Sequence, residues 1–275
     1  MTMAFYRQKG MEIVENRIKK SIIPLPAARR DQSNEIAATS GFHGTEIAKR
    51  YIETSLQPSS LLKDPDEHKK LLILDLNGTL VSRTHKKTGM FVRPYQDEFL
   101  HYIFRYFTVM VWSSAMPKSV DNMCQLFGDY RKQLALIWDR THFGFTHEDY
   151  VRNVSTVKDM DIVWRGFQGG CYDATNTILL DDSRKKARLQ PYNAIHVYEF
   201  EHYSESFRMH GERELLHAMR YLEDVRRQSN VCSYMRQHPY QCSDPSDDPR
   251  HENEKKVYHY EFSTRKKDLW DFSKL

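Results

Sequence analysis

The sequence lacks a long apolar run. No window approaches the roughly 20 apolar residues that a membrane-spanning helix requires, and the mean hydropathy is −0.71. We therefore expect a soluble chain without a membrane span. The first 30 residues also lack the apolar core of a secretory signal, and their bases are interspersed with acids, which mitochondrial leaders avoid. These features predict an intracellular protein of the nucleus or cytoplasm rather than the mitochondrion.

Cysteine and charge of one sign are scarce as well. The four cysteines show no even spacing, which indicates reduced thiols rather than a disulfide framework. The 41 basic and 37 acidic residues leave a formal net charge of only +4, and no basic groove interleaved with aromatic residues is legible. This balance argues against nucleic acid as a partner. It makes nucleic-acid end processing the weakest of three functional hypotheses.

The chain does contain enough apolar sequence for one large domain with appendages. Residues 1–65 are interpreted as an N-terminal appendage, partly disordered or helical, because Pro58 and Pro65 interrupt them. Residues 66–228 form the predicted α/β domain. Residues 229–275 are interpreted as a C-terminal tail that is partly disordered and contains a late strand at 255–262.

Apolar strand patterns alternate with helical patterns from residue 70 onward. Such alternation is typical of a parallel sheet covered by helices on both faces, so we predict an α/β, Rossmann-like fold. Helices are expected from Pro94, from about Pro117, and over 212–227, each with one apolar face. The predicted strands are 71–76, 108–112, 135–138, 177–181 and 194–198.

Acidic residues follow two of these strands. Asp75 follows the apolar run 71–74, and Asp181 with Asp182 follows the run 178–180. Acids at strand ends also cap the next helix, and that interpretation stays open for either motif alone. Together the two motifs favour a site at the carboxyl edge of the sheet, because buried acids need a compensating cation. Oxygen ligands with room for water and phosphate suit Mg²⁺.

Other polar residues occupy matching positions. Ser113 follows the second predicted strand, where its hydroxyl would bind a phosphate or cap the next helix. Lys158 would neutralise a phosphate as a point charge, although a lone lysine in a charged loop usually faces solvent. Thr79 would bond within the loop after Asp75 or cap it, and Arg140 is a candidate substrate contact. The basic run 184–186 is interpreted as a solvated helix face, with recruitment of an anionic partner as the minor alternative.

Five phrases of the sequence carry these residues in a fixed order. They are Leu72-Ile73-Leu74-Asp75-Leu76-Asn77-Gly78-Thr79-Leu80-Val81; Arg93-Pro94 with Glu98-Phe99-Leu100; Val111-Trp112-Ser113-Ser114; Val157-Lys158-Asp159-Met160; and Leu180-Asp181-Asp182-Ser183 with Gln190-Pro191-Tyr192-Asn193-Ala194. In this order they resemble the haloacid dehalogenase superfamily, in its branch of small carboxy-terminal-domain phosphatases, Dullard-like phosphatases and nuclear-LIM-interactor-interacting factors. The resemblance extends from about residue 70 to residue 198. It implies a Rossmann-like, three-layer haloacid-dehalogenase-type fold with a parallel central sheet.

The resemblance also implies a role for each matched residue. Asp75 would be the nucleophile that forms an aspartyl phosphate, and Lys158 would neutralise charge during the reaction. The hydroxyls of the Ser113-Ser114 pair, with Thr79 nearby, would bind the phosphate. The implied ligands of a Mg²⁺ ion are Asp75, Asn77 through its backbone carbonyl, Asp181 and Asp182.

The sequence departs from the family pattern at two places. Asn77 replaces an Asp that protonates the leaving oxygen and later activates water, and general acid–base help of this kind is worth about 10²–10⁴-fold in rate. The second departure is a short loop at 83–91, where small carboxy-terminal-domain phosphatases insert an extra β element. We therefore do not carry over the polymerase-tail substrate.

Two hypotheses follow for the function. The first is a Mg²⁺-dependent phosphatase for phosphoserine or phosphothreonine in proteins, slow because of Asn77. The alternative is a catalytically inactive pseudophosphatase that binds a phosphorylated protein, an acidic peptide or another protein partner, including a role like that of the mitochondrial import receptor with a related domain.

Overall fold

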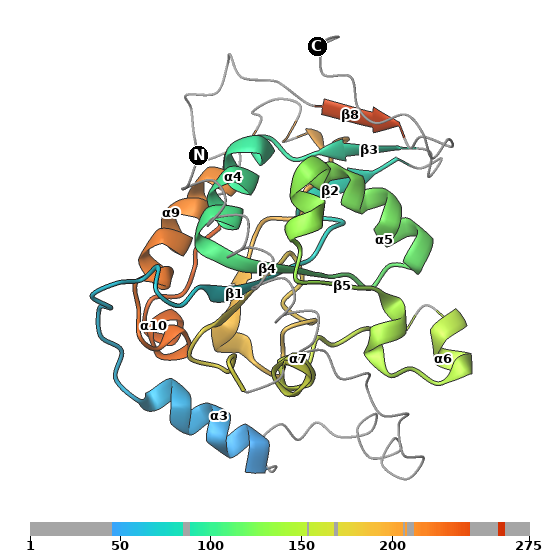
Figure 1. Cartoon of the computed structure of the whole chain (residues 1–275). Helices are drawn as coiled ribbons and strands as arrows, with labels where there is room; N and C mark the ends of the chain where they lie inside the picture. The colour runs from blue at the N-terminus through green and yellow to red at the C-terminus, as the bar shows by residue number, and fades with distance from the viewer. Residues whose placement is uncertain are drawn as a thin grey trace, which may run out of the picture.

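The structure is a computed structural model that describes residues 46–84, 89–152, 154–167, 170–205, 207, 212–242 and 258–261. Its centre is a sheet of five parallel strands in the order β5-β4-β1-β6-β7 (Figure 1). This arrangement confirms the predicted α/β class with a parallel central sheet. The strands are β1 (Lys70–Leu74), β4 (Phe107–Trp112), β5 (Leu136–Trp138), β6 (Thr177–Asp181) and β7 (Ala194–His196).

The central strands are apolar on both faces because both faces are covered. Every residue of β1 and β6 is buried, which is the usual pattern for strands inside a parallel sheet. In β1, Leu72 and Leu74 pack with the residues of three helices, whereas Leu71 and Ile73 pack with those of a fourth. The first three are α4 (Gln96–Tyr106), α5 (Pro117–Met123) and α9 (Glu214–Arg226), and the fourth is α7 (Met160–Gly166), which lies on the opposite side of the sheet in Figure 1.

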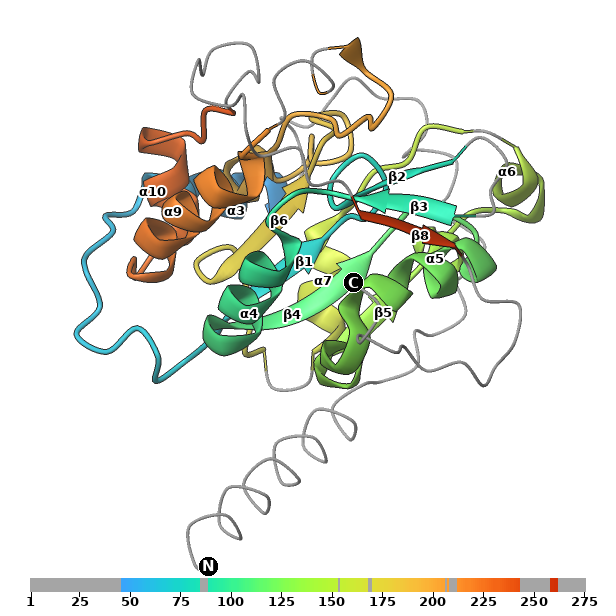
Figure 2. The ribbon, with the colours of Figure 1, turned by 90° about the horizontal axis from the view of Figure 1, so that it is seen from above.

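A second, antiparallel sheet stands beside the carboxyl edge of the first. Strand β2 (Val81–Arg83) pairs with β3 (Gly89–Val92), and β3 pairs with β8 (Tyr258–Glu261), as Figure 2 shows. The expectation of a plain loop at 83–91 is therefore wrong, because the chain forms a β-hairpin there. The late strand expected within 255–262 is confirmed, and it completes this small sheet.

Segments on either side of the central sheet region in sequence pack together. Helix α3 (Glu46–Leu56) contacts α10 (Val231–Gln237), and the Asn230 side chain donates a hydrogen bond to Thr54 O at 2.8 Å. The buried Tyr51 hydroxyl accepts a hydrogen bond from Tyr192 N at 2.8 Å. The division at residues 65/66 and 228/229 stays a prediction, and its calls on residues 1–45, 243–257 and 262–275 lie outside the described residues.

The remaining elements are short. Among the described residues, no helix has the length and apolar character needed to cross a membrane. These elements are the helix α6 (His147–Val151) and the 3₁₀ turns η1 (Cys124–Gln133), η2 (Arg140–Phe143) and η3 (Pro191–Asn193).

Candidate active site

Three neighbouring strands end in polar residues at one edge of the central sheet. Asp75 follows β1 and its backbone N–H donates to Leu180 O at 3.0 Å, while Asp181 is the last residue of β6. Ser113 follows β4, and its N–H donates to Trp138 O at 2.9 Å. Since β4, β1 and β6 are adjacent and parallel, their carboxyl ends bring these side chains together. This is the edge where α/β sheets bind ligands.

The turn after Asp75 requires glycine at position 78. Gly78 has a φ of +84°, and a Cβ atom there would lie 3.0 Å from Asp182 Cγ. The next residue, Thr79, is buried and fixes the same acid. Its hydroxyl accepts from Asp182 N at 3.1 Å and donates to Asp182 Oδ1 at 3.2 Å. The turn between β1 and β2 therefore sets the position of Asp182.

Asp75, Asp181 and Asp182 form one acidic cluster. Each offers a carboxylate oxygen, and these oxygens lie within 4.8 Å of one another. Asp75 and Asp181 are buried, and Asp75 Oδ1 is buried without a hydrogen-bond partner among the described residues. Buried carboxylates in this arrangement need positive charge. The cluster fits a Mg²⁺ ion, which prefers carboxylate and carbonyl oxygens, and the three side chains would hold it together with the Asn77 carbonyl.

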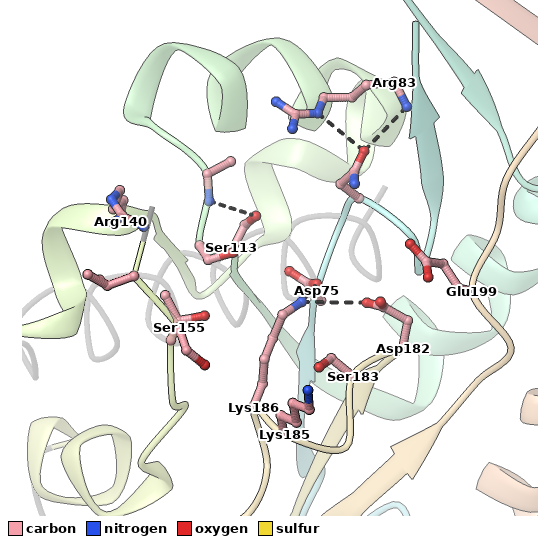
Figure 3. A pocket seen from close by; sticks show the side chains of 15 residues that line it. Asp75, Arg83, Ser113, Arg140, Ser155, Asp182, Ser183, Lys185, Lys186 and Glu199 are labelled. Carbon is pink, nitrogen blue, oxygen red and sulfur yellow. Dashed lines mark hydrogen bonds and ion pairs between the residues drawn. The ribbon is translucent and has the colours of Figure 1, made fainter. Parts of the chain in front are cut away.

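Two lysines contact the acidic cluster. Lys158 is fully buried, and its Nζ lies 2.6 Å from Asp181 Oδ2 and 3.2 Å from Asp75 Oδ1. Lys186 Nζ lies 2.5 Å from Asp75 Oδ2 and 3.2 Å from Asp181 Oδ1. Figure 3 shows Asp75, Lys186 and Asp182 pointing toward one another. Both ammonium groups therefore bridge Asp75 to Asp181.

Lys186 is a site residue that the sequence interpretation missed. The run 184–186 was expected on a solvated helix face, but the chain forms successive turns there, with Lys186 N donating to Ser183 O at 3.1 Å. That turn directs Lys186 into the pocket because Asp181 and Asp182 lie at its start. The signal in the sequence was the spacing from Asp182 to Lys186, since residues four apart meet when the chain turns helically.

The pKa values of these groups follow from burial and from the neighbouring charges. Burial alone raises the pKa of Asp75, but the ammonium groups of Lys158 and Lys186 outweigh it and hold that pKa below its usual value. Burial raises the pKa of Asp182 to about 6, with Lys186 opposing the shift and the other two carboxylates adding to it. Burial lowers the pKa of Lys186, but the three carboxylates more than reverse this and raise it. Asp75 is therefore a carboxylate, and Lys186 is an ammonium, at neutral pH.

Asn77 and Arg140 are held by local hydrogen bonds. Asn77 Oδ1 accepts from Arg83 N at 3.3 Å and from Arg83 Nε at 3.2 Å. The guanidinium of Arg140 is buried and donates to three backbone carbonyls between residues 149 and 152. Arg140 thus anchors the wall of the pocket, and its proposed contact with a substrate stays a prediction.

A polar cavity of about 390 Å³ opens above Asp75. A smaller one of about 270 Å³ adjoins it and shares Asn77, Arg83 and Glu199. Ser113 and Ser114 line the larger cavity as predicted for phosphate-binding residues, while Arg83, Ser155, Lys185 and Glu199 were not anticipated. The residues that line the larger cavity are Asp75, Asn77, Arg83, Ser113, Ser114, Ala115, Arg140, Val154, Ser155, Thr156, Asp182, Ser183, Lys185, Lys186 and Glu199.

Comparison with known proteins agrees with this arrangement. Residues 70–232 match the family described as NLI interacting factor-like phosphatase. An uncharacterized FCP1 homology domain-containing protein of Schizosaccharomyces pombe is 33% identical over 208 residues, which cover 68% of this chain and 84% of that relative. Ubiquitin-like domain-containing CTD phosphatase 1 of Xenopus tropicalis is 26% identical over 185 residues, 66% of this chain and 56% of the relative. The solved structure of Fcp1, an essential RNA polymerase II CTD phosphatase, aligns with a TM-score of 0.47 at 11% identity and covers 70% of this chain and 73% of that chain.

The chain belongs to the NLI interacting factor-like phosphatases, the branch of the haloacid dehalogenase superfamily that its motifs resemble. This confirms the resemblance seen in the sequence. The family and its named relatives favour an enzyme over the non-catalytic alternative. The chain spans only about half the length of the ubiquitin-like CTD phosphatases that it matches, 56% in the Xenopus tropicalis protein.

Proposed function

We propose that this chain is a Mg²⁺-dependent protein serine/threonine phosphatase that acts through an aspartyl phosphate on Asp75. One observation carries the proposal: a buried carboxylate lies at the floor of a polar cavity with two ammonium groups and two further carboxylates around it. A carboxylate attacks phosphorus only when the repulsion between the two anions is offset. Lys158 and a divalent cation at the acidic cluster supply that positive charge.

The proposed reaction has two displacements at phosphorus. In the first, an Asp75 oxygen forms a bond to phosphorus while the bond from phosphorus to the serine or threonine oxygen breaks. In the second, water attacks the same phosphorus, the acyl-phosphate bond breaks, and Asp75 is regenerated with release of inorganic phosphate. Lys158 holds the Asp75 carboxylate, and the hydroxyl of Ser113 binds a phosphate oxygen. Bound Mg²⁺ would neutralise charge on the transferred phosphoryl group.

Asn77 makes both displacements slow. An amide side chain neither donates a proton to the leaving oxygen nor accepts one from the attacking water at neutral pH. The general acid–base contribution, about 10²–10⁴-fold, is therefore lost at this position. Hydrolysis of the aspartyl phosphate suffers too, so the covalent intermediate accumulates during turnover.

The proposed substrate is a phosphorylated protein. The relatives named as CTD phosphatases are phosphatases of that kind, and the two adjoining cavities offer room for a phosphorylated side chain and for the residue next to it. Basic side chains of Arg83 and Lys185 line the larger cavity and attract an anionic segment. The four cysteines are free thiols, which suits the proposed nuclear or cytoplasmic setting.

Release of inorganic phosphate tests the proposal. Purified chain with Mg²⁺ is incubated with phosphoserine and phosphothreonine peptides, alongside Asp75→Asn and the matched control Asp129→Asn, whose carboxylate is exposed on η1. We expect release by the wild type and by Asp129→Asn, and none by Asp75→Asn or after chelation of the metal. No release from any peptide by the wild type, or equal release by Asp75→Asn, would refute the function.

A further inference from the structure

The ammonium group of Lys186 lies among the three carboxylates of the acidic cluster. Its Nζ is 2.5 Å from Asp75 Oδ2, 3.2 Å from Asp181 Oδ1 and 3.5 Å from Asp182 Oδ1. These are the same three side chains that offer oxygens within 4.8 Å of one another. A cation coordinated by all three would need the space that this ammonium group fills.

The backbone holds Lys186 in this position. Lys186 O accepts a hydrogen bond from Lys158 N at 2.8 Å, so the two lysines of the site are joined through the main chain. The Lys186 side chain is only 17% exposed. Its neighbour Lys185 lines the same cavity but is exposed, and no ion pair with the acidic cluster is recorded for it among the described residues.

A count of charges explains what this ammonium group does. Three carboxylates carry −3, and the two lysines carry +2, which leaves −1 for the cluster without metal. Because Asn77 is neutral, it adds no negative charge to attract a metal. A divalent cation that joined both lysines would change the sum to +1 and would bring an ammonium group within a few ångströms of the metal. Such cations repel strongly at low dielectric, so Lys186 and the metal exclude each other.

We propose that Lys186 is an internal competitor of Mg²⁺: its ammonium group neutralises the acidic cluster before the metal binds and must leave when the metal arrives. This inference rests on the Mg²⁺ site of the proposed function. The consequence is a phosphatase whose metal affinity is weakened by its own side chain. Mg²⁺ concentration, rather than substrate alone, then determines how much of the enzyme is competent.

Binding of Mg²⁺ in the absence of substrate tests the competition. Calorimetric titration of the full chain compares wild type, Lys186→Gln and the matched control Lys185→Gln. We expect Lys186→Gln to bind Mg²⁺ about tenfold or more tightly than wild type, because a unit charge beside the ion is removed, and Lys185→Gln to change the affinity by less than about threefold, since its charge is solvent-screened. Equal affinities for Lys186→Gln and Lys185→Gln, or no binding by either, would overturn the inference.

A second measurement uses only the wild-type chain, in case Lys186→Gln does not fold. An amine-acylating reagent is applied with and without Mg²⁺, and the modified lysines are quantified by mass spectrometry. We expect Mg²⁺ to raise the acylation rate of Lys186 severalfold and to leave that of Lys185 unchanged. Protection of Lys186 by Mg²⁺, or no change, would contradict its release. Neither measurement requires catalysis, so a chain without phosphatase activity that meets both expectations would refute the proposed function and leave the competition standing.

Discussion

Asn77 and Arg83 are joined by two hydrogen bonds to a single oxygen, with Arg83 N and Nε both donating to Asn77 Oδ1. The residue two positions after the nucleophile is thereby tied to strand β2 of the small sheet. Asn77 is neutral, so Arg83 gains a hydrogen-bond acceptor there but no counter-charge. The pair explains how an amide is accommodated where the family pattern has a carboxylate.

Restoring that carboxylate should raise activity. We expect Asn77→Asp to increase the rate of phosphate release from a phosphopeptide by up to about 10²–10⁴-fold, the range for general acid–base catalysis. The double variant Asp75→Asn with Asn77→Asp should be inactive, which shows that the gain passes through Asp75. Steady-state release of phosphate in Mg²⁺ measures both. A lower rate for Asn77→Asp than for wild type would contradict the role assigned to position 77.

Arg83 should limit the gain from Asn77→Asp. A guanidinium beside the new carboxylate favours its ionised form, which reduces its ability to protonate the leaving oxygen. We therefore expect Asn77→Asp with Arg83→Gln to release phosphate faster than Asn77→Asp alone, and Arg83→Gln alone to bring no comparable gain. The comparison uses the maximal rate on one phosphopeptide. Identical rates with and without Arg83→Gln would show that the guanidinium does not act on position 77.

The turn that carries Asn77 should tolerate no side chain at Gly78. Alanine there would have a positive φ, and its Cβ would lie 3.0 Å from Asp182 Cγ, so we expect Gly78→Ala to displace Asp182 and to lose both Mg²⁺ binding and phosphate release. Gly144→Ala is the matched control, because Gly144 has a φ of +68° but nothing within 4 Å of such a Cβ. Both should lose about 1–2 kcal/mol of unfolding free energy from the left-handed backbone. Equal activity of the two variants would show that contact with Asp182 is immaterial.

A buried ion pair supports the same turn from the other side. Arg93 Nε lies 2.9 Å from Glu212 Oε1, both side chains are almost fully buried, and Arg93 Nη1 donates to Thr79 O at 2.8 Å. Glu212→Ala would leave a buried guanidinium without its counter-charge, so we expect a loss of about 3–5 kcal/mol in the free energy of unfolding. Denaturation in urea measures it.

The control for that loss is an exposed ion pair. Glu46 and Arg50 are paired at 3.7 Å on the surface of α3, and Glu46→Ala should lower the unfolding free energy by less than about 1 kcal/mol. A similar, small effect for Glu212→Ala would mean that Arg93 finds another partner and that the ion pair does not hold the turn at Thr79.

The parts of the fold that were predicted from sequence are those with local signals. The apolar runs of β1 and β6, each followed by an acid, indicated buried parallel strands and placed Asp75 and Asp181 at one edge. The hairpin β2–β3 was missed because its strands are short and its third strand, β8, comes from near the end of the chain. Lys186 was missed because a basic run in sequence does not reveal which of its members a turn directs inward.

The central claim is that Asp75 becomes covalently phosphorylated, and borohydride trapping tests it most directly. Enzyme turning over a phosphopeptide in Mg²⁺ is treated with borohydride, which reduces an acyl phosphate to an alcohol, and the peptide that contains residue 75 is analysed by mass spectrometry. We predict homoserine at position 75, formed only with both substrate and Mg²⁺ and abundant because Asn77 does not activate water. Phosphate release without any reduction at position 75 would contradict the account.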